Sequence, residues 1–155
     1  MGVEIERKFL VVGEEWKALA QPVLLRQAYL NSSKERVVRV RIEGELAFLT
    51  IKGINQGISR SEWEYAIPLH EAQEMFESVC EQASIEKLRY RITFGKHLWE
   101  VDEFLGENVG LCIAEVELSS EQESFLRPDW LGKEVSHDHR YANAQLFKFP
   151  YTQWK

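Results

Sequence analysis

The sequence contains no apolar run that approaches the roughly 20 residues a helix needs to cross a bilayer. Its first residues enter a charged strand-like segment without a basic and then apolar leader, so we expect no signal peptide, no membrane partner and a cytoplasmic location. Cysteine is scarce as well. Cys80 and Cys112 have no neighbours at metal-ligand spacing, which predicts free thiols and excludes a disulfide framework.

Positive charge is not in excess, because the formal net charge is −6 at pH 7. This balance argues against extended nucleic-acid binding, which needs clustered lysine and arginine. It leaves room for a small polyanion in a local basic site. Internal repeats, low-complexity tracts and long linkers are also absent, and the 155 residues predict a single domain over residues 1–155.

Hydrophobic periodicity predicts mostly β structure joined by short turns. Alternating polar and apolar residues indicate eight strands, at about residues 3–12, 24–30, 36–42, 46–52, 60–67, 87–92, 99–102 and 114–118. Short helices are expected at residues 13–20, 69–82, 119–127 and 141–147.

The opening segment Glu4-Ile5-Glu6-Arg7-Lys8 carries the first chemical signal. Successive side chains of a strand point to opposite faces, so Glu4, Glu6 and Lys8 share one face, with the two carboxylates roughly 7 Å apart. Such carboxylates suit a hard cation such as Mg²⁺ or Mn²⁺, and the lysine suits a phosphate bound to that cation. Taken alone, the pattern is more typical of a solvated strand face, and only its recurrence along the chain favours the site.

The same alternation recurs in almost every predicted strand. The charged positions are, for the cations, Lys8, Arg39, Arg41, Lys52, Arg60, Lys87, Arg89 and Arg91, and for the anions, Glu4, Glu6, Glu62, Glu64, Glu100, Asp102, Glu115 and Glu117. The two signs occur in equal numbers, and arginine, the residue suited to bidentate phosphate recognition, outnumbers lysine.

This charged face has two possible positions in a barrel. An ordinary small barrel fills its interior with apolar side chains, which would place the charges outside. The apolar stripes of the predicted helices favour the opposite arrangement, because they need an apolar outer surface to cover, with Trp63 and Trp99 on it. The charges would then line a hydrated channel that is nearly neutral when empty. Its acidic end would hold about two divalent cations and its basic end the phosphates of a triphosphate group.

At this point the sequence resembles the CYTH superfamily, the triphosphate tunnel metalloenzymes. The resemblance rests on Glu4-x-Glu6-x-Lys8, Gln27-Ala28-Tyr29-Leu30, Arg39-x-Arg41, Thr50-Ile51-Lys52, Glu62-x-Glu64, Lys87-x-Arg89, Glu100-x-Asp102, Glu115-x-Glu117 and Arg140-Tyr141-x-Asn143. It implies an α+β fold, a closed eight-stranded antiparallel β-barrel with a charged interior and short helices packed outside. It also implies the activity of small bacterial inorganic triphosphatases, the hydrolysis of tripolyphosphate to pyrophosphate and phosphate.

The resemblance also assigns roles to individual residues. The expected metal ligands, for two Mg²⁺ or Mn²⁺ ions, are Glu4, Glu6, Asp102, Glu115 and Glu117. The expected substrate-binding cations are Lys8, Arg39, Arg41, Lys52, Lys87 and Arg89. The expected catalytic residues are Lys8, Glu62, Glu64 and Lys87, with either glutamate as the proton acceptor. The expected partner is tripolyphosphate or another small triphosphate, and a homodimer stays open.

Three alternatives remain. The same cradle suits a class IV-type adenylate cyclase or a nucleotide or thiamine triphosphatase, with Tyr29 or Phe48 stacking on a ring at a tunnel mouth. A non-catalytic polyphosphate-binding module would need the cations but not the paired carboxylates. The segment His137-Asp138-His139 has the residue types of a metal site, but we expect a solvated turn, because Mg²⁺ prefers oxygen ligands.

Overall fold

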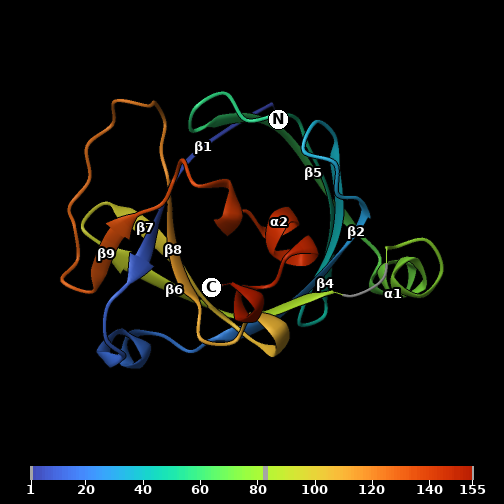
Figure 1. The fold of residues 1–155 in the computed structure, drawn as a ribbon, viewed down its shortest axis with the longest axis horizontal. Coiled ribbons are helices and arrows are strands. Elements are labelled where there is room, and N and C mark those ends of the chain that lie inside the picture. Colours follow the sequence, from blue (N-terminus) through green and yellow to red (C-terminus); the bar gives the residue numbers. More distant parts are fainter. Residues whose placement is uncertain (1, 82–83, 155) are drawn as a thin grey trace.

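The computed structural model describes residues 2–81 and 84–154 and has a closed antiparallel barrel at its centre (Figure 1). The barrel strands are β1 (Val3–Val11), β2 (Val23–Asn31), β3 (Val37–Glu43), β4 (Leu46–Lys52), β5 (Ser59–Ile67), β6 (Ile85–Phe94), β7 (His97–Phe104) and β8 (Cys112–Glu117). Their spatial order is β5-β4-β3-β2-β6-β7-β8-β1, and β1 closes the ring by pairing with β5. The predicted eight-stranded α+β barrel is confirmed.

Strand β1 closes the barrel because it pairs with β8 along one edge and with β5 along the other. Glu4 lies opposite Arg60 of β5, whereas Glu6 lies opposite Glu117 of β8. Both pairings are antiparallel and place the even-numbered side chains of β1 on the inner face. The N-terminal strand therefore joins the two edges of the sheet and carries its charged residues into the interior.

The apolar face points outward, as predicted. One buried cluster on the outer wall contains Phe9 and Trp99, and the 3₁₀-helix η1 (Glu15–Leu19) covers part of it with Trp16. The α-helix α1 (Leu69–Ser78) packs on β3 and β4 through the buried Ala72. Helix α1 ends earlier than the predicted limit of residue 82, which lies outside the described residues.

The helix predicted at residues 119–127 is wrong. This segment is non-helical and leads into a short strand, β9 (Leu131–Glu134), which pairs with the outside of β1. The irregular path brings the Phe125 ring edge-on to Phe9 and Trp99, with ring centroids 6.0 and 5.6 Å apart. A helix stopped by Pro128 would have been too short to be stable without such packing.

The second α-helix, α2 (Asn143–Lys148), lies across one opening of the barrel rather than on its wall (Figure 1). Its buried Leu146 packs in a cluster with Tyr29 and Phe104. The 3₁₀-helices η2 (Gly106–Asn108), η3 (His139–Tyr141) and η4 (Tyr151–Gln153) lie in the connections around this end. The Tyr151 backbone N–H donates to Asn108 Oδ1 at 2.8 Å, which joins η4 to η2. One end of the barrel is thus covered by the C-terminal segment.

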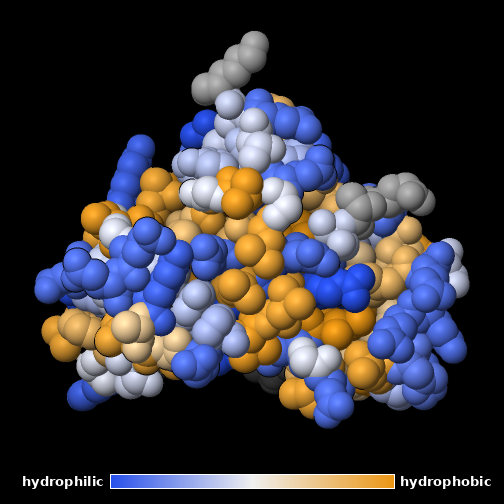
Figure 2. Space-filling view, turned by 90° about the horizontal axis from the view of Figure 1, so that it is seen from below, coloured by the Kyte–Doolittle hydropathy of each residue, from blue (hydrophilic) through white to orange (hydrophobic). Residues whose placement is uncertain are grey.

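The outer wall is not fully covered. Trp63 and Tyr65 on β5 are 41% and 55% exposed, so the prediction that a helix covers Trp63 is wrong, whereas Trp99 is buried as predicted. Figure 2 shows apolar side chains in the middle of one face, flanked by hydrophilic surface. Within the part of the chain that the structure describes, no helix is both long and apolar enough to cross a membrane.

Candidate active site

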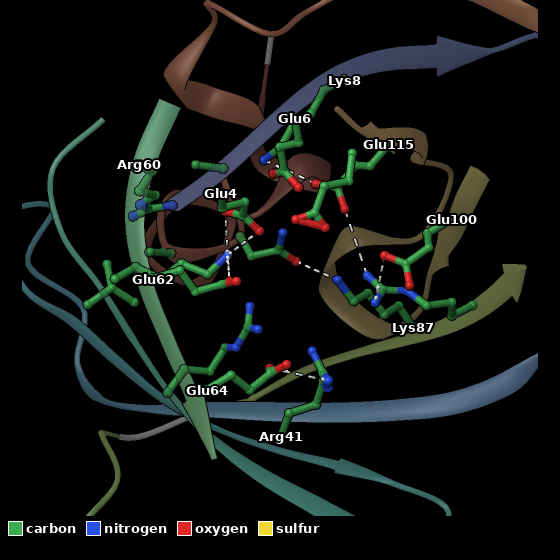
Figure 3. Close-up of a pocket in the computed structure, with 18 of the residues that line it drawn as sticks. Glu4, Glu6, Lys8, Arg41, Arg60, Glu62, Glu64, Lys87, Glu100 and Glu115 are labelled. Atoms are coloured by element: carbon green, nitrogen blue, oxygen red, sulfur yellow. Dashed lines mark hydrogen bonds and ion pairs between the residues drawn. The ribbon is translucent and has the colours of Figure 1, made fainter. Parts of the chain in front are cut away.

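A cavity of about 200 Å³ lies inside the barrel, and its lining is almost entirely ionisable (Figure 3). Because alternate residues of each strand face inward, the charged positions of distant segments converge there. The sequence-predicted site residues that line it are Glu4, Glu6, Lys8, Arg39, Arg41, Lys52, Glu62, Glu64, Lys87, Arg89, Glu115 and Glu117. Of the predicted set, Asp102 alone is missing from this lining in the described structure.

The first wall of the cavity is acidic and comes from β1 and β8. Glu6 lies opposite Glu117 and Lys8 opposite Glu115 in the ladder, and Lys8 Nζ is 3.5 Å from Glu115 Oε2. Burial, together with the neighbouring Glu115 and Glu4, raises the pKa of Glu6 well above its usual range. The pKa of Glu117 rises to about 6 through burial and the nearby carboxylates. This wall carries more negative charge than its single lysine neutralises.

Lys52 of β4 reaches across to the same carboxylates. Its Nζ lies 3.2 Å from Glu4 Oε1 and 3.3 Å from Glu62 Oε2, with little exposure of either Lys52 or Glu4. Burial opposes ionisation of Glu4, but Lys52, with help from Glu62 and Arg39, outweighs it and lowers the pKa of Glu4 to about 2. Burial raises the pKa of Glu62. The two carboxylates therefore share one buried ammonium.

The basic wall comes from β3. Arg39 and Arg41 lie on its inner face, and the buried Nε of each has no hydrogen-bond partner among the described residues. The Arg41 guanidinium lies 3.4 Å from Glu64 and 4.9 Å from the Phe48 ring centroid. Burial and the neighbouring Arg39 lower the pKa of Arg41. Buried donors without partners cost free energy, so this wall suits an anion.

The cavity floor, defined here as Lys87, Arg89 and Asp102, lies toward α2. Asp102 is 2% exposed and accepts two hydrogen bonds from Arg89 at 2.8 and 2.9 Å, and it lies 2.8 Å from Lys87 Nζ. Lys87 also donates to Asn143 Oδ1 of α2 at 3.0 Å. Burial lowers the pKa of Lys87 to about 8, although Asp102 opposes the shift.

Besides three apolar residues, five polar residues line the cavity that were not expected as metal ligands, substrate-binding cations or catalytic residues. They are Tyr29, Arg60, Arg91, Glu100 and Asn143. Strand alternation already placed Arg60, Arg91 and Glu100 on the charged face. Asn143 has no periodic signal, because it enters from a helix that crosses the barrel end, and only the Arg140-Tyr141-x-Asn143 motif marked it.

The acidic wall offers oxygen donors of the kind that Mg²⁺ and Mn²⁺ prefer. The raised pKa of Glu6 reports carboxylate repulsion that a divalent cation would relieve. In this structure Lys52 and Lys8 lie against Glu4 and Glu115, and no three described acidic, histidine or cysteine side chains form a ready coordination group. The donor types fit a hard cation, provided that the lysines leave the carboxylates.

The segment His137-Asp138-His139 lines a surface depression, and Asp138 and His139 also line a small cavity of about 40 Å³ together with Glu4, Glu6 and Lys8. Asp138 pairs with Arg140 at 2.7 Å and accepts from its backbone N–H. Residues 136–137 form a turn that leads into η3, which agrees with the expected turn. Cys80 and Cys112 are free thiols, as predicted.

Comparison with known proteins agrees with this geometry. The CYTH domain family matches residues 2–146. An inorganic triphosphatase of Acetivibrio thermocellus is 53% identical over 155 residues, which cover 100% of this chain and 99% of that protein. An inorganic triphosphatase of Nitrosomonas europaea is 38% identical over 148 residues, covering 92% and 95%. A crystal structure of an inorganic triphosphatase superposes with a TM-score of 0.66 at 34% identity, covering 92% of this chain and 96% of that one. With its charged barrel interior and a match over most of its length, the chain belongs to the CYTH domain family.

Proposed function

We propose that this protein hydrolyses inorganic triphosphate to pyrophosphate and phosphate inside the barrel, in a reaction that depends on a divalent metal ion. The observation that carries the proposal is the pair of buried arginines, Arg39 and Arg41, whose Nε donors have no partner among the described residues and which line the same cavity as the acidic wall. A triphosphate supplies the missing acceptors, and its charge suits a cavity built from both signs.

The size and walls of the cavity favour a bare phosphate chain over a nucleotide. Its volume of about 200 Å³ is below the roughly 300–1,000 Å³ of pockets for larger organic ligands. The prediction that Tyr29 lies at a tunnel mouth is wrong, because Tyr29 is 1% exposed and packs against Phe147 with ring centroids 5.0 Å apart. The Phe48 ring already lies beside the Arg41 guanidinium. Each ring thus already has a packing partner, Phe147 for Tyr29 and Arg41 for Phe48.

We assign the metal to the acidic wall, as two Mg²⁺ or Mn²⁺ ions held by Glu4, Glu6, Glu115 and Glu117. When bound, such ions neutralise charge on phosphate oxygens and lower the pKa of a bound water. Lys8 and Lys52 would exchange their carboxylate partners for phosphate oxygens. This exchange keeps each buried charge paired with and without ligand.

The residues of the chain then position the reaction. A bond forms between a water oxygen and the terminal phosphorus, the bridging P–O bond breaks, and pyrophosphate leaves with the electron pair. Lys8 and Lys87 stabilise the charge that develops on the phosphoryl group and the leaving group. Glu62 is the better proton acceptor because burial raises its pKa, whereas Glu64 accepts a hydrogen bond from Thr50 and lies against Arg41.

The test is phosphate release from tripolyphosphate, ATP and thiamine triphosphate at fixed Mg²⁺ and at fixed Mn²⁺, each with an excess-chelator control and a parallel assay for cyclic AMP. Chelator-sensitive turnover that is fastest with tripolyphosphate supports the proposal. Faster turnover of a nucleotide or of thiamine triphosphate supports the alternative enzymes, and binding of tripolyphosphate without turnover supports a binding module. The single-domain organisation, the cytoplasmic location and the homodimer stay predictions.

A further inference from the structure

Asp102 is the one predicted metal ligand that the barrel places beneath the cavity surface. Its carboxylate receives Arg89 Nε on Oδ1 at 2.8 Å and Arg89 Nη2 on Oδ2 at 2.9 Å. Lys87 Nζ lies 2.8 Å from the same Oδ2. Both oxygens are therefore used by cations of the neighbouring strand β6, in short contacts typical of charge-assisted hydrogen bonds.

This position is poorly suited to binding a metal. Asp102 is 2% exposed and is not among the residues that line the cavity, whereas Lys87 and Arg89, which hold its carboxylate, do line it. Glu100, two residues earlier on the same face of β7, does line the cavity, with a side chain that is 34% exposed. To reach a cavity ion, Asp102 would have to leave two buried cations, and a buried charge left without its partner is strongly destabilising.

Lys87 is held on a second side by α2. Its Nζ donates to Asn143 Oδ1 at 3.0 Å and lies 5.3 Å from the centroid of the Phe104 ring (Figure 3 shows the Lys87 contact beside the cavity). An ammonium has three N–H donors, and Asp102 and Asn143 engage two of them. These two contacts, with Asp102 of β7 and Asn143 of α2, fix the direction of the third N–H donor of Lys87.

We infer that Asp102 is a positioning residue: it fixes the directions of Lys87 and Arg89 toward the triphosphate, and it does not bind the metal. The inference rests on the proposed function, because it names how two of the substrate-binding cations are held. A planar carboxylate that receives the guanidinium fork fixes the orientation of Arg89 as well as its place. The flexible side chain of Lys87 likewise loses conformational entropy before the substrate binds, which reduces the entropic cost of binding.

The experiment compares Asp102→Asn, Asp102→Glu and Glu6→Gln with the wild type. Glu103→Gln is the matched control, because Glu103 is the next residue on β7 but contacts Lys17 at 3.1 Å instead of the cavity. Two quantities are measured for each folded variant. The first is the affinity for tripolyphosphate in the presence of chelator, by calorimetry, and the second is the Mn²⁺ concentration that gives half-maximal hydrolysis.

Positioning predicts that Asp102→Asn weakens metal-free binding of tripolyphosphate about 10-fold or more, while half-saturation by Mn²⁺ stays within about 2-fold of the wild type. Asp102→Glu should also weaken the binding of tripolyphosphate, because the longer side chain displaces the guanidinium group of Arg89. Glu6→Gln should shift the metal titration instead, and Glu103→Gln should change neither quantity.

Unchanged binding in Asp102→Asn together with a Mn²⁺ half-saturation raised about 10-fold would overturn the inference and restore Asp102 to the ligands. If Asp102→Asn does not fold, the same two measurements are made on Asp102→Glu and on Asn143→Ala. Both variants should bind tripolyphosphate more weakly while the Mn²⁺ half-saturation stays unchanged. Unchanged binding with a raised Mn²⁺ half-saturation would contradict the positioning role of Asp102. A wild-type protein that neither binds nor hydrolyses tripolyphosphate would contradict the proposed function itself, a result distinct from either pattern.

Discussion

Replacing Lys52 by methionine should destabilise the fold by an amount that depends on pH. Lys52 Nζ lies 3.2 Å from Glu4 and 3.3 Å from Glu62 inside the barrel, and methionine fills a similar volume without the charge. The pKa of Glu4 falls from 4.5 to about 2 in the folded protein, with Lys52 the main group that lowers it against the effect of burial. At about 1.4 kcal/mol per pH unit, this shift corresponds to about 3 kcal/mol of stability.

The direction of the pH dependence follows from the lowered pKa. The Glu4 contribution is fully present above pH 4.5, the value for the unfolded chain, and is lost as the pH falls toward about 2. The Lys52→Met variant lacks this contribution at every pH. We therefore expect it to unfold with about 3 kcal/mol less free energy than the wild type at pH 7, and with a smaller difference at pH 3.5. At pH 7 this loss corresponds to a Tm lower by roughly 6–12 °C.

The assay is urea unfolding followed by tryptophan fluorescence at both pH values in the presence of chelator. Lys17→Met is the control, because Lys17 pairs with Glu14 and Glu103 at the surface, where such pairs contribute less than about 1 kcal/mol. A difference between Lys52→Met and the wild type that is under 1 kcal/mol at pH 7, or equal at both pH values, would refute the reasoning.

Three further predictions concern the reaction. Lys8→Ala and Arg39→Ala should each lower tripolyphosphate turnover roughly 100-fold or more, because each removes a charge-assisted contact to the substrate in a site of low dielectric constant. Near wild-type rates in folded protein would contradict their assignment as substrate-binding residues. Glu6→Gln should raise the concentration of Mg²⁺ or Mn²⁺ needed for half-maximal rate, and an unchanged titration would remove Glu6 from the ligands. Since burial lowers the pKa of Lys87 to about 8, kcat/KM should fall as the pH rises past that value and Lys87 loses its charge, whereas Lys87→Arg should not show this decline below about pH 10. A decline of equal midpoint in both proteins would assign the titration to another group.

Strand alternation explains why most of the cavity lining was predictable. It is a local property: once a segment is a strand, the faces of Arg39 and Arg41 follow from the stereochemistry of the backbone. The helices then indicated which face is outside, since Ala72 of α1 needed an apolar wall to cover. The closure of the sheet through β1 came from the family resemblance, because no local pattern predicts that the first strand will pair with both β5 and β8.

The segment after β8 shows where local signals failed. Ser120 and Glu123 have the spacing of a capping box, but the Glu123 carboxylate accepts the backbone N–H of Ser119. No helix follows among these residues, because Glu123 also contacts His97 at 2.6 Å and Phe125 packs onto the barrel wall. The same local hydrogen bond is compatible with both conformations, and tertiary packing of the partly buried Phe125 ring selects the non-helical one.

Depth along the barrel axis is the property that alternation cannot supply, and it separates Glu100 from Asp102. Both are acidic, both occupy the inner face of β7, and a period of two treats them as equivalent. The ladder differs between them: Glu100 lies opposite Glu115 of β8 and Arg91 of β6, whereas Asp102 lies opposite Arg89 and an apolar residue, Ile113. A carboxylate that lies between an arginine and an apolar residue is expected to form an ion pair with the arginine, because a buried carboxylate needs a partner of opposite charge. Register therefore decides which acids remain available to a metal ion, and register is fixed by partners that are far apart in the sequence.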